Sequence, residues 1–176
     1  MIHQLDFNGL DKVEKAIKRL QLYEPKDEGY YLCFSGGKDS VVIKALADMA
    51  GVKYDAHYSV SSVDPPELVR FIKDKHPDVI FDIPKDKDGK PISMWSLIPK
   101  KSMPPTRIVR YCCQYLKENG GAGRLKVTGV RWAESVRRRQ SQSEVTITDK
   151  KAQRFIEEEL SDEDFLLTRQ GGWCFV

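Results

Sequence analysis

Apolar residues along the chain follow two patterns that alternate, helical spacing in some segments and short runs in others. Residues 9–23 carry Leu10, Val13, Ile17 and Leu20 at helical spacing and predict an amphipathic helix. Helical spacing returns at 40–50, 66–76 and 107–118, and short runs typical of strands occur at 30–34, 54–60, 78–83 and 125–130. This order predicts an α/β fold in which helices cover both faces of a twisted parallel sheet.

Glycine, proline and hydroxyl residues predict where these elements begin and end. Gly51 suits the end of the helix at 40–50, and Asp64 suits the cap of the helix that Pro65-Pro66 begin. Thr106 suits the cap of the helix at 107–118. Residues 85–106 are predicted to form a long loop with a short helical turn, and such loops beside a parallel sheet are often functional. The whole chain, residues 1–176, is predicted to be a single domain.

Composition adds limits to this picture. The 176 residues are 40% hydrophobic and 31% charged, and the formal net charge of +3 is too small to indicate nucleic acid by itself. Neither a signal peptide nor a run long enough to span a bilayer is found, so we expect a cytoplasmic protein with no membrane partner. The chain ends abruptly at GGWCFV, which we interpret as an apolar segment cut before its partner element.

The segment FSGGKDS, residues 34–40, joins the first predicted strand to the following helix. Gly36 and Gly37 let backbone N–H groups approach an anion without a Cβ in the way. The helix directs its partial positive charge at the same place. Ser35 and Ser40 add hydroxyl donors, and Lys38 adds a cation. The segment therefore predicts a site for the phosphates of ATP.

Asp39 is unusual in such a site because its carboxylate repels phosphate. A magnesium ion held by Asp39 and by phosphate oxygens would remove this conflict. The GxxxxGK[ST] pattern of the Walker A loop is absent, so this is a different kind of phosphate loop. The alternative is a glycine turn with surface charges, but strand, loop and helix follow in the order that a phosphate site requires.

A second motif, VTGVRWAESVRRR at residues 127–139, follows the last predicted strand. Gly129 permits close approach of the backbone to a ligand, and Arg131 is expected at the same sheet edge as residues 35–40. An arginine there can bind phosphate or sulfate as a two-pronged donor. Arg137 belongs to a basic cluster that attracts anions, although a solvated basic turn is the alternative for its neighbours Arg138 and Arg139.

Together, SGGKDS, SVDPPEL, RYCCQYLKE and GVRWAESVRRR resemble the phosphoadenosine phosphosulfate reductase family, over about residues 30–139. SGGKDS also resembles the PP-loop signature SGGxDS of the ATP pyrophosphatase superfamily. The resemblance implies an adenine nucleotide alpha-hydrolase-like fold, with the phosphate loop on Ser35 to Ser40 and a later nucleotide-binding segment on Gly129 and Arg131. The loop looks more like that of ATP sulfurylase and other ATP-splitting members than that of the reductases, whose C-terminal catalytic cysteine has no match here.

The four cysteines, without a secretory signal, are more typical of reduced thiols, metal ligands or redox groups than of disulfides. Cys112 and Cys113 lie in the helix predicted at 107–118, where Cys112 joins an apolar face with Ile108 and Tyr111. Cys112 is then a small core residue. The alternative is an iron–sulfur cluster, because some relatives begin one with a Cys-Cys pair, but the later Cys-x-x-Cys of those relatives is absent.

The opposite face of that helix carries Arg107 and Arg110, which are expected to bind an anionic acceptor together with Arg131 and Arg137. The leading hypothesis is an enzyme that binds ATP and magnesium, splits the α–β phosphate bond and passes AMP to a sulfate- or sulfur-related acceptor. Lys38 would stabilise the departing pyrophosphate. Residues 59–64 either contact adenine or ribose, or only start a helix.

Two alternatives remain open. One is a thiol-dependent phosphoadenosine or adenosine phosphosulfate reductase. The other is a nucleotide-binding subunit without turnover of its own, which would serve a partner subunit, a homo-oligomer or a larger assembly acting on DNA. The basic segments are compatible with nucleic acid, but neither a stacking platform nor a recognised DNA-binding motif is found in the sequence to support this.

Overall fold

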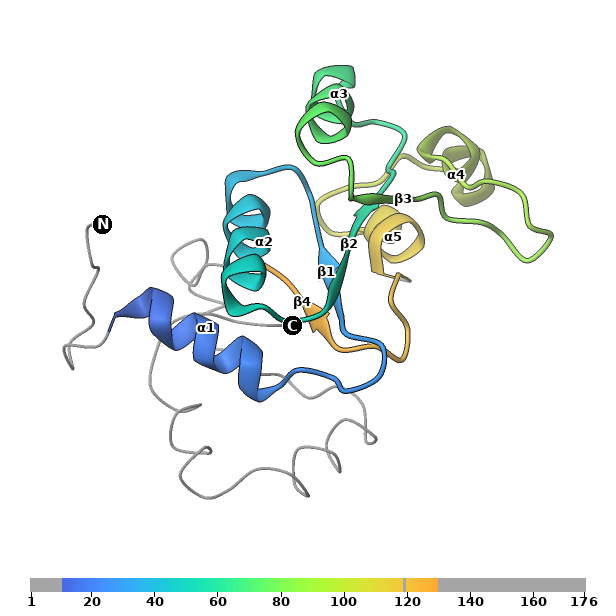
Figure 1. Cartoon of the computed structure of the whole chain (residues 1–176). Coiled ribbons are helices and arrows are strands. Elements are labelled where there is room, and N and C mark those ends of the chain that lie inside the picture. Colours follow the sequence, from blue (N-terminus) through green and yellow to red (C-terminus); the bar gives the residue numbers. More distant parts are fainter. Residues whose placement is uncertain (1–10, 119, 130–176) are drawn as a thin grey trace.

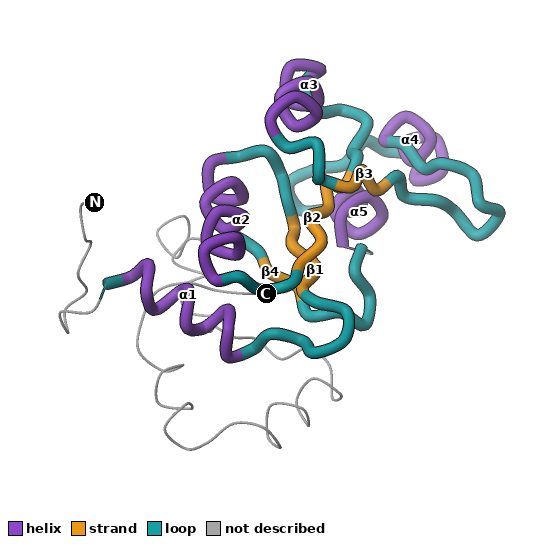
Figure 2. The backbone as a smooth tube through the Cα atoms, viewed as in Figure 1, coloured by secondary structure: helices purple, strands orange, loops and turns teal. Residues whose placement is uncertain are grey.

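A computed structural model describes residues 11–118 and 120–129, and its centre is a four-stranded sheet (Figures 1 and 2). The strands are β1 (Tyr30–Cys33), β2 (Tyr54–Ser59), β3 (Ile80–Asp82) and β4 (Lys126–Val127). Their order is β3-β2-β1-β4, and all three pairings are parallel. The predicted α/β class and parallel sheet are therefore confirmed.

The described residues also form five helices and one π-helical segment. They are α1 (Lys12–Leu22), α2 (Lys38–Ala50), α3 (Pro66–Lys75), α4 (Met94–Lys101), α5 (Tyr111–Cys113) and η1 (Gln114–Glu118). Figure 1 shows α2 and α5 on opposite sides of the sheet. No helix within residues 11–118 and 120–129 is long and apolar enough to cross a membrane.

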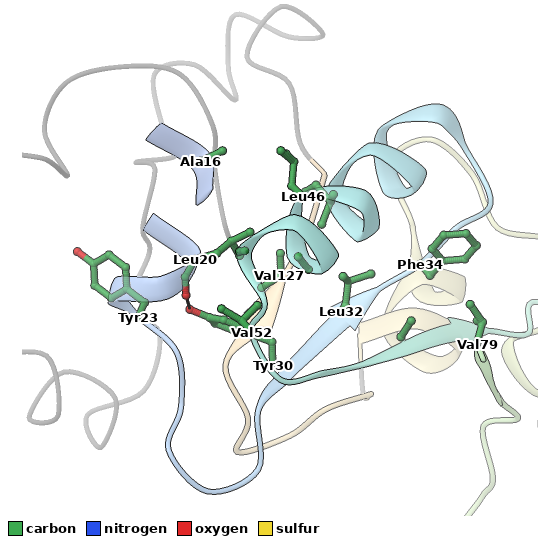
Figure 3. Close-up of a cluster of buried hydrophobic side chains, with 14 of the residues drawn as sticks. Ala16, Leu20, Tyr23, Tyr30, Leu32, Phe34, Leu46, Val52, Val79 and Val127 are labelled. Atoms are coloured by element: carbon green, nitrogen blue, oxygen red, sulfur yellow. Dashed lines mark hydrogen bonds between the residues drawn. The ribbon is translucent and has the colours of Figure 1, made fainter. Parts of the chain in front are cut away.

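The main core fills the space between the sheet and helices α1, α2 and α3 (Figure 3). Leu32 of β1 is fully buried there, beside Ala56 of β2 and Val127 of β4 in the parallel register. Ile43 and Ile72 close it from α2 and α3. Fully burying an aliphatic side chain contributes about 1.5–3 kcal/mol, so this layer fixes the helices that start at the carboxyl edge of the sheet.

The other face of the sheet is more polar because alternate residues of a strand point to opposite sides. The Tyr31 hydroxyl donates to Asp82 Oδ2 at 2.7 Å, and its ring stacks on His57 with 4.1 Å between centroids. His57 Nδ1 lies 2.9 Å from the same carboxylate oxygen. Gly121 packs against the Tyr31 ring so closely that a Cβ there would lie 2.5 Å from the ring. The chain after η1 therefore covers this face.

Two predicted helix starts, at residues 107 and 40, and two predicted caps, Thr106 and Asp64, are wrong. The helix expected from residue 107 begins at Tyr111, because Thr106 first closes a tight turn: Val109 N donates to Thr106 Oγ1 at 2.9 Å and Thr106 N donates to Val109 O. Ile108, expected on an apolar helix face, is 92% exposed. Asp64 does not cap α3, whose N-cap is Pro65. The helix predicted from residue 40 begins at Lys38.

Residues 85–106 were predicted to form a long loop with a short helical turn, but they contain more secondary structure than that. Lys85 and Pro91 form an antiparallel bridge, and α4 follows with a reciprocal capping box between Ser93 and Ser96. Leu97 of α4 packs with Tyr111 and Leu116 in a second, smaller core. Together with α5 and η1 this region forms a small packed unit, residues 83–117, which we call the α4 unit.

Candidate functional site

The candidate phosphate loop leaves the carboxyl end of β1 and enters α2. Gly36 adopts φ +73°, and a Cβ there would lie 2.6 Å from Leu68 Cδ1 of α3. A left-handed backbone and this contact both require glycine. Gly37 is the N-cap of α2 and has no side chain to accept from the N–H groups of the first turn. The loop therefore turns the start of α2 toward solvent.

The two serines of the loop use their hydroxyls within it. Ser40 is buried, and its Oγ donates to the Gly37 carbonyl at 2.8 Å. Ser35 Oγ donates to Ser40 Oγ at 3.2 Å and accepts from Gly37 N at 3.4 Å. These bonds hold Gly37 at the start of the helix, which differs from the predicted role of the serines as donors to an anion.

Lys38 and Asp39 occupy the first turn of α2. Lys38 is exposed, and Asp39 is half-buried. Gly129, just beyond β4, packs on this turn: a Cβ at Gly129 would lie 3.0 Å from the carbonyl carbon and oxygen of Asp39. The expected closeness of residue 129 to the loop is present, and the close approach is to the backbone of Asp39. The structure thus brings β1, α2 and the end of β4 together at one edge.

The segment after β2 forms a second turn at the same edge of the sheet. Its polar groups hydrogen-bond to one another within the turn. Asp64 Oδ2 accepts from Ser61 N at 3.1 Å and from Ser61 Oγ at 2.5 Å. Burial raises the pKa of Asp64, but the Ser61 hydrogen bonds and the nearby charge of Lys117 outweigh it, so the pKa lies below its ordinary value. Asp64 stabilises its own turn instead of capping α3.

Ser62 ties this turn to the α4 unit. It adopts a left-handed backbone with φ +63°, and its Oγ accepts from Met94 N at 2.8 Å. This link between residues far apart in the sequence has no signal in the local pattern. It places the N-terminus of α4 beside the carboxyl end of β2.

The arginines expected to bind an acceptor fall in two parts of the chain. Arg107 and Arg110 are exposed in the turn before α5, and Arg110 Nη2 lies 3.2 Å from Cys113 Sγ. Arg131 and Arg137 lie outside the described residues. The structure therefore tests neither the grouping of these four arginines nor the expected place of Arg131 near the phosphate loop.

The cysteines show little metal-binding geometry where they are described. Cys112 and Cys113 are partly buried at α5, and burial raises the pKa of the Cys33 thiol in β1. Within residues 11–118 and 120–129, no three histidine, cysteine or carboxylate side chains gather in a way that could hold a metal ion. Cys174 lies outside these residues, so the structure does not test the iron–sulfur hypothesis. Asp39, at the start of α2, is a carboxylate beside the loop that could hold a magnesium ion.

The polar group formed by Tyr31, His57 and Asp82 was missed by sequence reasoning. Its members come from three strands, and the only signal was the polar residues at alternating positions of β1 and β2. Comparisons with protein-family models, with curated proteins and with solved structures gave no match.

Proposed function

We propose that the chain is an ATP-binding enzyme of the PP-loop type, with an adenine nucleotide alpha-hydrolase-like fold. The observation that carries this proposal is the arrangement of loop 35–40. A buried strand delivers Gly36 and Gly37 to the carboxyl edge, and α2 begins there behind a glycine N-cap with Lys38 exposed beside it. Ligands of parallel α/β sheets bind at such an edge, and anions bind at such a helix start.

The proposed reaction is cleavage of the α–β phosphate bond, in which an acceptor oxygen or sulfur attacks the α phosphorus and pyrophosphate leaves. Loop N–H groups and Lys38 stabilise the charge that develops on the departing pyrophosphate. Asp39 holds magnesium, which neutralises phosphate charge when it is bound with ATP. Beyond the described residues, Arg131 is proposed to orient a sulfate- or sulfur-related acceptor.

Positioning and electrostatics carry this mechanism, because a thiol nucleophile at the loop has little support. Cys33 ends β1 immediately before the loop, but burial raises the pKa of its thiol and so favours the protonated form. Cys33 is therefore given no nucleophilic role in the proposed reaction.

The test is a product assay with ATP and magnesium, with and without sulfate, that separates AMP, ADP, pyrophosphate and adenosine phosphosulfate. We expect AMP or an adenylylated product in equal amount to pyrophosphate, and a loss of at least about tenfold in Lys38→Ala. ADP and orthophosphate as products would overturn the proposal. Saturable ATP binding without turnover would instead identify a nucleotide-binding subunit that needs a partner.

A further inference from the structure

Positive charge is concentrated in the α4 unit, residues 83–117. This stretch holds eight lysine and arginine residues against two aspartates and no glutamate, whereas the whole chain has a formal net charge of only +3. All eight basic residues are exposed. The rest of the chain is therefore net acidic when its charges are summed.

Hydrogen bonds fix the backbone that carries the basic side chains of this unit. In the loop before α4, which carries Lys85, Lys87 and Lys90, Asp86 Oδ1 accepts from the backbone N–H of Asp88 at 3.0 Å and from that of Lys90 at 2.9 Å. One of the two acidic side chains is thus engaged in the turn, and its other oxygen lies 3.8 Å from Lys100 Nζ. The two aspartates offset two of the eight positive charges, so the unit stays strongly basic.

An exposed aromatic ring lies in the same segment as these charges. Trp95, in the first turn of α4, is 70% exposed, while Leu97, two residues later, is buried in the small core. A helix rises about 1.5 Å per residue, so Lys100 and Lys101 follow Trp95 by about 8 Å along α4. An exposed ring in a segment that carries several cations offers a base-stacking surface together with phosphate contacts.

The basic surface continues beyond α4. The Tyr111 hydroxyl donates to the Met103 carbonyl at 2.7 Å, which fastens the turn carrying Arg107 and Arg110 to the end of α4. Ser62, at the carboxyl end of β2, fastens the other end of the unit through Met94 N. The surface therefore borders the sheet edge where the candidate phosphate loop lies.

From this arrangement we propose that the α4 unit binds single-stranded nucleic acid, with Trp95 as the stacking platform and the lysines of the loop before α4 as phosphate contacts. Basic residues spread over a loop, a helix end and a second turn suit an extended polyanion. An exposed ring suits unpaired bases, whose faces are accessible, better than a duplex, in which bases already stack on each other.

The test measures binding of a fluorescent oligothymidylate of about 15 nucleotides by anisotropy, without ATP, at several salt concentrations. We expect Trp95→Ala to weaken binding about tenfold and Trp95→Phe to retain most of the affinity, because phenylalanine still stacks. The double variant Lys87→Gln/Lys90→Gln should lower the slope of log affinity against log salt by about 1.4, or about 0.7 for each lost phosphate contact.

The matched control is Lys12→Gln/Lys18→Gln, which removes two exposed lysines of α1, at the far end of the molecule from α4 in Figure 1. Binding that falls equally in this control, or that is unchanged in Trp95→Ala, would overturn the proposal. Equal affinity for polyglutamate of matched charge would also overturn it and indicate an acidic protein partner. Because ATP is left out, failure here is distinct from failure of the proposed ATP chemistry.

Discussion

The helices α2 and α3 begin at the same edge of the sheet, yet they present different chemistry there. α2 starts behind Gly37, and the N–H groups of its first turn face an open glycine loop. α3 starts at Pro65-Pro66, and proline has no N–H to donate. The acidic side chain before it, Asp64, is held by Ser61 instead. Only α2 combines backbone donors with an exposed lysine.

This difference teaches why a strand, a turn and a helix at a sheet edge do not by themselves define an anion site. What matters is which groups are left to donate once the turn has satisfied its own hydrogen bonds. The turn after β2 is closed around a carboxylate, so it repels anions. The turn after β1 is closed around two serine hydroxyls and leaves the helix start open.

The largest effect is expected from Gly36→Ala. The added Cβ would meet Leu68 of α3 at 2.6 Å in a backbone with φ +73°, so the loop must move away from α3. We expect ATP affinity to fall at least about thirtyfold, a loss of about 2 kcal/mol, which is the upper end of the strain for one left-handed residue even before the contact with Leu68. Isothermal titration with ATP and magnesium measures it.

Gly51→Ala is the control for this variant. Gly51 has a similar backbone, φ +69°, at the other end of α2, with nothing within 4 Å of the added Cβ. It should lower the free energy of unfolding by about 1 kcal/mol and leave ATP affinity unchanged. Equal loss of ATP binding in both variants would show that strain in α2, and not the loop, limits binding.

Lys38→Ala should have the next largest effect, and it should depend on the ligand. Removing one cation from the first turn of α2 should weaken ATP binding about tenfold but AMP binding much less, because AMP lacks the β and γ phosphates. Lys44→Ala is the control on the same helix, since Lys44 is already paired with Asp78 at 3.0 Å. Equal weakening of ATP and AMP would contradict the assignment of Lys38 to the outer phosphates.

Asp64→Asn tests the closed turn. Asparagine keeps the shape but loses the charge that accepts from Ser61 N and Oγ, so the free energy of unfolding should fall by about 1–2 kcal/mol. Urea unfolding measures this change. ATP affinity should stay the same, because this turn donates nothing to the phosphates. A clear loss of ATP affinity would show that the turn after β2 also touches the nucleotide.

The smallest expected effect is the pH dependence of the stability that the Asp64 carboxylate contributes. Because the folded protein lowers the pKa of Asp64 below its ordinary value of 3.8, its contribution is full above that value. It is lost as the pH falls through the lower folded pKa. Wild-type protein should therefore lose its stability advantage over Asp64→Asn as the solution is acidified below about pH 4. A difference between the two that does not change with pH would contradict this account.

Sequence reasoning reached the parallel sheet and the strand–loop–helix order at residues 30–50, because both have strong local signals. The short apolar runs predicted the strands, and SGGKDS predicted the loop and the helix that follows it. Sequence reasoning failed where the same residue suits two different local structures. An aspartate before Pro-Pro fits a helix cap as well as a turn closed on Ser61, and Thr106 fits a helix cap as well as the turn to Val109. It also missed Tyr31, His57 and Asp82, since only the register of three strands brings them together.

The strand order carries a consequence for how the protein is made. β1 lies between β2, which follows it closely in the sequence, and β4, which pairs with it through Tyr31 and Lys126. At a synthesis rate of about 5–20 residues per second, β1 and α2 emerge several seconds before the strand that completes their sheet. Gly129 packs on Asp39 only after that strand has docked. The nascent chain therefore exposes an unpaired edge of β1 for this interval, and such an edge can pair with another chain and cause aggregation.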